Sequence, residues 1–204
     1  MKKWILAHRG EWSQDVPANS AASLNCAILH GFGIETDIRD QGSELVISHD
    51  PCIDEKYERF EQFLSQDSRI AINIKSDGLL TKLEPMRSLI TDSKSFVFDC
   101  SFPELLRFKR AGIPHAIRIS EFERELYWEP NYIWLDAFES DWWLEDATTL
   151  KMIEKIQTVI VSPELHKRDF TNVWNKALML RSSGLDISVC TDFPNELASA
   201  AGIK

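Results

Sequence analysis

The sequence predicts an α/β fold and, within that class, a small (β/α)8 TIM barrel. Short β-branched runs alternate with helix-like stretches along all 204 residues, which is the pattern of βαβ units around a parallel sheet. Eight such runs at about 25 residues per unit place the chain near the small end of the ~200–400 residues of closed barrels. No linker or low-complexity tract interrupts it, so we expect one domain over residues 1–204. A doubly wound open sheet is the competing fold.

The eight candidate strands share β-branched and aromatic side chains and lie at 4–7, 33–38, 69–75, 95–100, 115–120, 132–136, 158–162 and 186–191. Side chains alternate between two faces along a strand. In 70–75 the isoleucines share one face, whereas Ala71, Asn73 and Lys75 share the other. Polar residues of the other strands also fall late on one face. In a barrel that face lines the lumen, and its late positions form the C-terminal mouth, where barrel enzymes carry out chemistry.

Helices are expected between these strands. Residues 20–30 should form a helix that ends before Gly31, a favourable C-terminal cap. Residues 101–112 should form another, which begins with the capping-box pattern Ser101-Phe102-Pro103-Glu104. Longer helices are expected over 141–156 and 170–183. The fifth unit is the weakest, because "EFERELYWEP" (121–130) leaves room for only a short helix.

Composition and charge exclude several classes of partner. The formal net charge is −9, so the surface repels nucleic acid phosphates and anionic lipid. The four cysteines lie far apart without a CxxC pair, which is typical of reduced thiols in a cytoplasmic protein. The apolar run "WILA" is too short for a signal peptide, and none approaches the roughly 20 residues of a membrane span. We therefore expect a cytoplasmic protein without stable membrane insertion; the sequence leaves its oligomeric state open.

Two carboxylates point to a cation site at the predicted mouth. Glu35 and Asp37 occupy positions i and i+2 of one strand, so they share a face and lie about 7 Å apart. Unpaired, they would repel each other and be costly to bury. A hard divalent cation, Mg²⁺ or Ca²⁺, would resolve this repulsion. The alternative is that Lys75, Arg9 or Arg118 neutralises them as structural ion pairs.

Two histidines lie beside these carboxylates in the predicted fold. His8 ends the first strand, and His49 lies at the end of a second apolar run, 45–50, that follows the carboxylate strand. Histidine acts as a general acid or base near neutral pH, provided that such groups converge. Of the other histidines, His166 follows the seventh strand and could contact substrate.

Arg9 and Lys75 add positive charge to the same predicted mouth. A guanidinium binds phosphate bidentately, and an ammonium acts as a point charge. Two acid–base groups, a cation site and two cationic side chains predict phosphoryl chemistry.

Several motifs then resemble a known family. The order "AHRG", "PANS", "GIETDIRD", "LVISHDP", "INIK" and "CTDFP" is similar to that of the glycerophosphodiester phosphodiesterases, whose (β/α)8 barrel is related to that of phosphatidylinositol-specific phospholipases C. The resemblance spans His8 to Pro194 and is most specific in the first quarter of the chain.

The resemblance implies metal-dependent hydrolysis of a small-molecule phosphodiester that has a free neighbouring hydroxyl. By this resemblance His8 and His49 form the acid–base pair, and Glu35 and Asp37 are two of the ligands of one Mg²⁺ or Ca²⁺ ion. Arg9 and Lys75 would bind the phosphate. We add Arg118, a cationic residue later in the chain, as a third predicted phosphate-binding residue.

The chain departs from the family pattern at three places. Asn73 replaces a glutamate that is the third metal ligand, so we expect Asn73 to ligate and Asp99 or Asp136 to lie within reach of the ion. "PANS" replaces "PENT", and its Asn19 is interpreted as the cap of the first helix and a structural brace of the nearby catalytic loop. Only 18 residues separate Asp50 from Arg69, where the family has an insertion of some tens of residues that helps to enclose glycerol.

The short insertion after the second strand predicts an open pocket and low activity on simple glycerophosphodiesters. Groups on later loops could replace it: Arg118, Glu121, Trp142, Trp143, Glu164 and His166. Helix packing is the preferred interpretation of the two tryptophans.

Two other functions remain open. One is a binding or regulatory barrel weakened by Asn73. The other is a different metal-dependent barrel enzyme, such as a sugar-phosphate lyase or isomerase.

Overall fold

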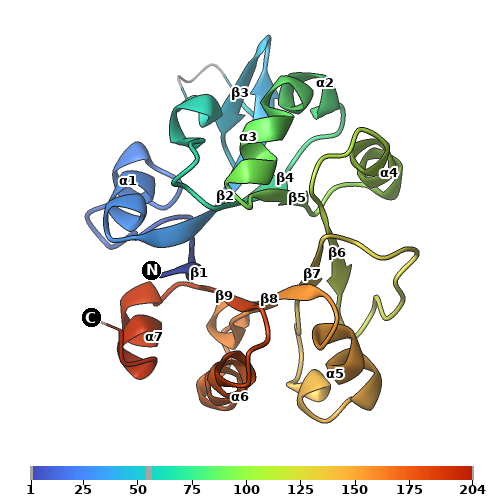
Figure 1. Cartoon of the computed structure of the whole chain (residues 1–204). Coiled ribbons are helices and arrows are strands. Elements are labelled where there is room, and N and C mark those ends of the chain that lie inside the picture. Colours follow the sequence, from blue (N-terminus) through green and yellow to red (C-terminus); the bar gives the residue numbers. More distant parts are fainter. Residues whose placement is uncertain (1, 54–56, 204) are drawn as a thin grey trace.

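The computed structural model describes residues 2–53 and 57–203, and its strands form a nearly closed barrel with the helices outside it (Figure 1). Eight parallel strands follow one another around the barrel in the order β5-β4-β2-β1-β9-β8-β7-β6. Their bounds are β1 Lys2–His8, β2 Phe32–Gln41, β4 Ile70–Ile74, β5 Phe96–Phe98, β6 Ala116–Ile119, β7 Tyr132–Leu135, β8 Gln157–Val161 and β9 Ile187–Thr191. The first strand pairs with both β2 and β9, which confirms the barrel and excludes the doubly wound sheet.

A ninth strand lies outside the barrel. β3 (Glu44–Ile47) pairs antiparallel with the end of β2, from Gln41↔Glu44 to Ile38↔Ile47. The chain therefore rises beyond the mouth along β2 and returns along β3 toward the mouth. This hairpin carries the apolar run 45–47 back to the carboxylate strand.

The barrel strands lie between two apolar clusters, one outside the barrel and one inside it. The larger core lies between strands and helices and includes Ile5, Ile34 and Ile72, all fully buried. The smaller fills the lumen with Leu6, Ala71, Phe96, Phe98, Ala116, Tyr132, Trp134, Val159, Val161 and Cys190. Alternation along each strand thus divides the side chains as predicted, with one face toward helices and the other toward the lumen.

The helices are α1 Ala21–Leu29, α2 Leu80–Leu83, α3 Arg87–Asp92, α4 Phe102–Arg110, α5 Ala147–Ile153, α6 Thr171–Ser182 and α7 Pro194–Ala200. Short 3-10 helices lie at η1 Phe60–Phe63, η2 Glu84–Met86, η3 Trp142–Leu144 and η4 Pro163–His166. The predicted helices 20–30, 101–112 and 170–183 correspond to α1, α4 and α6.

Three local expectations need correction. The predicted helix 141–156 is divided into η3 and α5, because Asp146 interrupts it to cap α5 through the Thr149 N–H at 2.8 Å. The capping box at Ser101 is half formed, since the Glu104 carboxylate accepts the N–H of Gly78 at 3.1 Å instead of that of Ser101. Residues 121–130 contain no helix.

The barrel has one weak seam. Between β5 and β6 the described residues show a single bridge, Val97↔His115, where the Val97 N–H donates to Pro114 O at 3.0 Å. The next connection, from β6 to β7, is the segment 120–131 without a helix, which runs outward between α4 and α5 in Figure 1.

Among the described residues, no helix has both the length and the apolar character needed to cross a bilayer. All four cysteines are free thiols.

Candidate active site at the barrel mouth

The centre of the site is a set of oxygen atoms on β2 and β4. The strand register places Asp37 beside Asn73, with Glu35 one step deeper beside Ala71. Glu35 and Asp37 are 1% and 0% exposed. The Asn73 Nδ2 group donates to Glu35 Oε1 at 3.1 Å. Three predicted ligands from two strands therefore meet on the lumen face.

The loop after β1 positions Arg9 against this centre. The Arg9 N–H donates to Glu35 O at 2.9 Å, and the backbone of Arg9 is left-handed, with φ 57°. Gly10 follows with φ +83°, and a Cβ there would lie 2.5 Å from the backbone carbon of Ser23. Only glycine lets α1 approach this closely. As a result, Arg9 Nε lies 3.0 Å from Asp37 Oδ2.

Asn19 orients the same carboxylate. Its Nδ2 group donates to Asp37 Oδ2 at 2.8 Å, and its Oδ1 accepts the Thr36 hydroxyl at 2.8 Å. The expectation that Asn19 caps the first helix is wrong, because its side chain is engaged with β2 and the side-chain cap of α1 is the next residue, Ser20. The bracing role predicted for Asn19 is therefore directed at the β2 carboxylate.

A chain of charges leads from Asp37 to the other side of the mouth. Lys75 Nζ lies 3.3 Å from Asp37 Oδ1 and 3.7 Å from Asp99 Oδ2. Asp99 also pairs with Arg118, whose Nη1 lies 3.6 Å from Glu123 Oε2. The alternative of structural ion pairs thus holds for Asp37, which contacts Arg9 and Lys75. Arg118 pairs with Asp99 and not with Glu35 or Asp37 among the described contacts.

His8 lies between two carboxylates. Its Nδ1 is 2.7 Å from Asp192 Oδ1, and its Nε2 is 3.8 Å from Glu35 Oε2. Burial alone would lower the pKa of His8, but the hydrogen bond with Asp192 and the charge of Glu35 outweigh it and raise that pKa. The raised pKa favours the protonated imidazole, as a general acid requires.

His49 lies at the rim. The Ser48 N–H donates to Asp37 O at 3.1 Å, so the β2–β3 hairpin brings the next residue, His49, to the mouth. Its side chain is 49% exposed, with Nδ1 2.9 Å from Asp50 Oδ1. The structure thus places both predicted histidines at one end of the barrel, His8 partly buried and His49 half-exposed.

The oxygen set fits a hard divalent cation. Asn73 Oδ1 is buried and accepts no hydrogen bond within the described chain, and buried Asp37 Oδ1 has only the Lys75 ion pair at 3.3 Å there. Burial raises the pKa of Glu35 despite the opposing charge of His8, and nearby Asp37 adds to the rise. A carboxylate, a second carboxylate and an amide oxygen are ligands that Mg²⁺ and Ca²⁺ accept.

The two aspartates expected to assist the ion have other partners. Asp99 is bound by Arg118 and Lys75. Asp136 Oδ1 lies 2.7 Å from His166 Nε2. Among the predicted ligands, Glu35, Asp37 and Asn73 are therefore the residues that could hold a cation.

A separate cluster on the outside of the barrel also has metal-binding chemistry. The ligand atoms of Glu11, Cys26 and His30 lie within 4.8 Å of one another. His30 Nδ1 already pairs with Glu11 Oε2 at 2.7 Å, and Glu11 Oε1 accepts from Asn195 at 2.6 Å. These contacts satisfy the cluster as a surface ion pair that links the β1 loop to α1 and α7.

Several residues gain roles that sequence reasoning missed. Asp192 is the partner of His8, and Glu164 accepts the Asp192 N–H at 3.1 Å. Asp136 and His166 form a second carboxylate–imidazole pair. The sequence signals were the "CTDFP" motif, which contains Asp192, and the position of Asp136 at a strand end. They did not identify the pairs, because the partners lie far away in sequence.

Three of the candidate substrate contacts stabilise the fold instead: Glu121, Trp142 and Trp143. Glu121 accepts the N–H groups of Phe138, Glu139 and Ser140 at 3.0, 3.0 and 3.1 Å. These bonds lower the pKa of Glu121, although burial alone would raise it. Trp143 is 1% exposed in the outer core, and Trp142 packs against that core, in agreement with the packing interpretation.

Comparisons with known proteins identify structural neighbours. No protein-family model and no curated protein matches the chain. A glycerophosphodiester phosphodiesterase from Agrobacterium tumefaciens is 16% identical with a TM-score of 0.65, covering 99% of this chain and 100% of that one. A candidate member of that enzyme class from Galdieria sulphuraria is 13% identical with a TM-score of 0.71, covering 99% and 98%. A glycerophosphoryl diester phosphodiesterase from Parabacteroides distasonis is 14% identical with a TM-score of 0.53, covering 97% and 85%. At these identities the likeness shows a shared fold.

Proposed function

We propose that the barrel mouth hydrolyses a small-molecule phosphodiester that carries a free hydroxyl next to the phosphate. One observation carries this proposal: His8 lies 2.7 Å from Asp192 and 3.8 Å from Glu35, beside the cationic Arg9 and Lys75. An oriented imidazole next to two cations suits proton transfer at a bound phosphate. The phosphodiesterase neighbours support the same activity.

His8 and His49 divide the proton transfers. In the first step the neighbouring hydroxyl oxygen attacks phosphorus, and His49 takes its proton. The bond from phosphorus to the leaving oxygen breaks, and the alcohol leaves with a proton from His8, which its raised pKa keeps available. Water then opens the cyclic phosphate with the two roles reversed, which restores both histidines.

Arg9, Lys75 and Arg118 hold the phosphate in this proposal. Arg9 and Lys75 now contact Asp37 at 3.0 and 3.3 Å, so a bound phosphate would share cations that the carboxylate already orients. A Mg²⁺ or Ca²⁺ ion, held by Glu35, Asp37 and Asn73, would supply further positive charge for the phosphoryl oxygens. With four free thiols, we propose that the protein acts in the cytoplasm.

The test is hydrolysis of a panel of glycerophosphodiesters and an activated aryl phosphodiester. Each is assayed with Mg²⁺, with Ca²⁺ and with a chelator, using wild type, His8→Ala and His49→Ala. His166→Ala is a matched variant, because His166 pairs with Asp136 at the mouth just as His8 pairs with Asp192. We expect cation-dependent turnover that is lost in the first two variants and kept in the third.

Other outcomes would identify the alternatives. Loss in His8→Ala and His166→Ala, with His49→Ala active, would move the base to His166. Cation binding without phosphodiester cleavage, but with turnover of a sugar phosphate, would favour a lyase or isomerase. Neither turnover nor cation binding would favour a binding or regulatory barrel. Glycerophosphocholine turnover at ~1–10³ s⁻¹ would contradict the low activity expected of the open pocket.

A further inference from the structure

A cavity of about 560 Å³ lies between the weak seam and the loop after β6. Its lining comes from three segments: the end of β5 and start of α4, the strand β6, and the helix-free loop 120–131. Where a barrel helix would normally cover these strands, the loop leaves a hollow of the size that small ligands occupy. We call this cavity the seam hollow.

Part of the lining is apolar and aromatic, beside five charged residues. Leu105, Ala116 and Ile117 line it together with three aromatic side chains. Those three, Phe102, Phe122 and Tyr127, are 50%, 70% and 68% exposed. Exposed aromatic side chains that gather around a cavity indicate a binding surface, whereas scattered ones need no explanation.

The seam hollow adjoins the candidate active site. Asp99 and Arg118 line the cavity. Asp99 Oδ2 also lies 3.7 Å from Lys75 Nζ, and the same ammonium group contacts Asp37. A phosphate held near Lys75 would therefore have one ester arm beside this cavity. Arg118 Nε is buried and lacks an acceptor within the described chain, so it can donate to an oxygen of a ligand that enters from the site.

The aromatic rim of three exposed rings, rather than charge, indicates the class of the occupant. Three carboxylates, those of Asp99, Glu123 and Glu125, and two guanidinium groups, those of Arg118 and Arg124, line the cavity. Asp99 and Glu123 pair with Arg118, and the Arg124 guanidinium carbon lies 3.6 Å from the ring centroid of Trp142. The rings of Phe102 and Tyr127 meet edge to face, with centroids 5.1 Å apart, so an apolar group can pack against them.

We propose that the seam hollow binds the leaving alcohol of the substrate, and that this alcohol carries a bulky apolar group. The inference rests on the proposed phosphodiesterase function and adds the chemical class of one ester arm. Burial of an apolar group against the aromatic rim favours such substrates over those with small leaving alcohols.

The experiment compares three glycerophosphodiesters that differ only in the leaving alcohol: ethanol, 2-phenylethanol and choline. We expect kcat/KM for the phenylethyl ester to exceed that of the ethyl ester by roughly 10-fold, with choline no better than ethyl. In Phe122→Ser and Tyr127→Ser the phenylethyl advantage should disappear while the ethyl ester keeps its kcat/KM. Met179→Ser, which alters an exposed apolar residue on α6, is the control and should change neither.

The other possible results either overturn or support the proposed apolar site. Equal kcat/KM for phenylethyl and ethyl esters, or preference for choline, overturns the proposal while leaving the phosphodiesterase function intact. If no ester is hydrolysed, the proposed function fails, and binding of free 2-phenylethanol is measured by saturation-transfer NMR. Binding by wild type that is lost in both rim variants then supports an apolar ligand site. Absence of binding, or binding unchanged in the variants, overturns it.

Discussion

At the scale of single residues, Asp192 orients His8 and, with Glu35, raises the pKa of His8 against the effect of burial. Replacement by asparagine keeps the size of the side chain but removes the charge that raises the pKa of His8. We expect Asp192→Asn to lower kcat by about 10–100-fold with little change in KM, as for other groups that orient a functional imidazole. Because His8 acts as an acid, its lower pKa should move the alkaline limb of the kcat profile to lower pH.

The control for this prediction is Asp67→Asn, since Asp67 is fully exposed and only pairs with Lys3 at 3.9 Å. It should leave both kcat and the pH profile unchanged. A profile that does not move in Asp192→Asn, despite lower kcat, would assign Asp192 a structural role instead.

We predict that Asn73 affects both cation affinity and the stability of the metal-free protein. Its Oδ1 is unpartnered and its Nδ2 donates to Glu35, so Asn73→Glu adds a third carboxylate and removes a donor. We expect Ca²⁺ or Mg²⁺ to bind roughly 10-fold more tightly, because affinity follows the ligand charge. The metal-free protein should have a lower Tm, because like charges repel when buried.

Calorimetric titration and thermal unfolding with and without chelator measure both effects. Asn172→Glu, on the exposed first turn of α6, is the matched control. Unchanged cation affinity in Asn73→Glu would remove Asn73 from the ligand set.

At the scale of elements, local patterns carried much of the prediction. Alternation in 70–75 identified both the strand and its lumen face, because one face of β4 contacts helices and the other contacts the site. The Asp192 partner of His8 lies 184 residues away in sequence, so no local pattern could reveal it. The segment 121–130 was expected to contain a short helix, but Glu121 instead bonds the N–H groups that follow β7.

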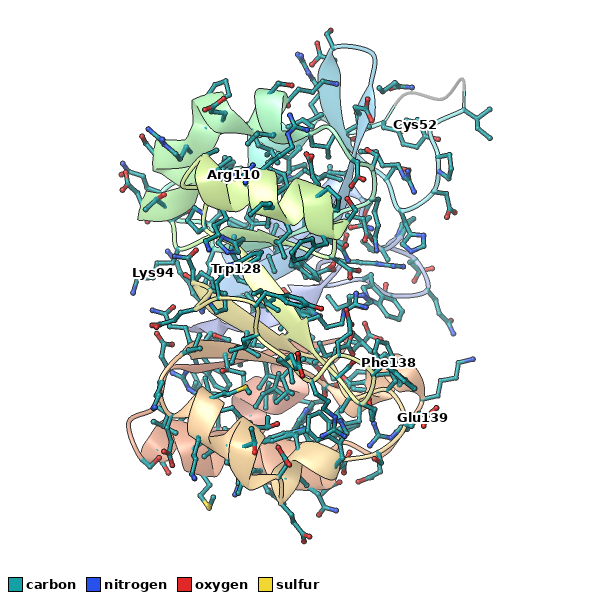
Figure 2. All side chains as sticks on the ribbon, turned by 90° about the vertical axis from the view of Figure 1, so that its right-hand side faces the viewer. Cys52, Lys94, Arg110, Trp128, Phe138 and Glu139 are labelled. Atoms are coloured by element: carbon teal, nitrogen blue, oxygen red, sulfur yellow. The ribbon has the colours of Figure 1, made fainter. Side chains whose placement is uncertain are left out.

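The segment after β6 is anchored by a neutral histidine. His115 Nε2 accepts the Trp128 Nε1–H at 2.8 Å, and His115 Nδ1 lies 3.1 Å from Ile113 O, which requires a proton on Nδ1. Burial lowers the pKa of His115, and the charge of Lys109 lowers it further, against the opposing bond to Ile113. Figure 2 shows Trp128 on this side of the barrel, near α4, which carries Arg110.

The sign of the pH effect follows from this lowered pKa. Below the ordinary pKa of histidine, about 6.5, the unfolded chain binds a proton that the folded chain resists, so stability is lost as pH falls. We expect the urea midpoint to fall less between pH 7.5 and pH 5.0 in His115→Gln than in wild type. His30→Gln is the control, because His30 is 55% exposed. An equal fall in His115→Gln and wild type would contradict this assignment.

At the scale of the whole molecule, the barrel places local positive charge within an acidic protein. The net charge of −9 excludes a broad anionic partner, yet Arg9, Lys75 and Arg118 gather at the mouth because strands and the β1 loop end there. Figure 2 shows the two ends of the barrel, with Lys94 before β5 on one side and Phe138 and Glu139 after β7 on the other. A small anionic substrate can therefore bind at one end although the surface as a whole repels anions.

Closure of the barrel depends on aromatic packing inside the lumen. The β5–β6 seam has one described bridge, but Phe96 stacks on Tyr132 with centroids 4.3 Å apart, and Phe98 on Trp134 at 3.9 Å. These stacks connect β5 to β7 past the short strand β6. They therefore supply contacts across a seam that has few hydrogen bonds. Loss of one stack should loosen the seam more than the rest of the barrel.

We therefore predict that Phe96→Ala costs about 3–5 kcal/mol in the free energy of unfolding and selectively speeds hydrogen exchange in β5 and β6. Phe108→Ala is the matched variant, since Phe108 is equally buried but belongs to the outer core beneath α4. Phe108→Ala should lower the free energy of unfolding by a similar amount. Hydrogen exchange in β5 and β6 should then rise no more than exchange in β1 and β2. If both variants speed exchange uniformly, the barrel opens only as one cooperative unit. Selective exchange at β5 and β6 would show that the seam beside the hollow opens independently of the strands that carry Glu35 and Asp37.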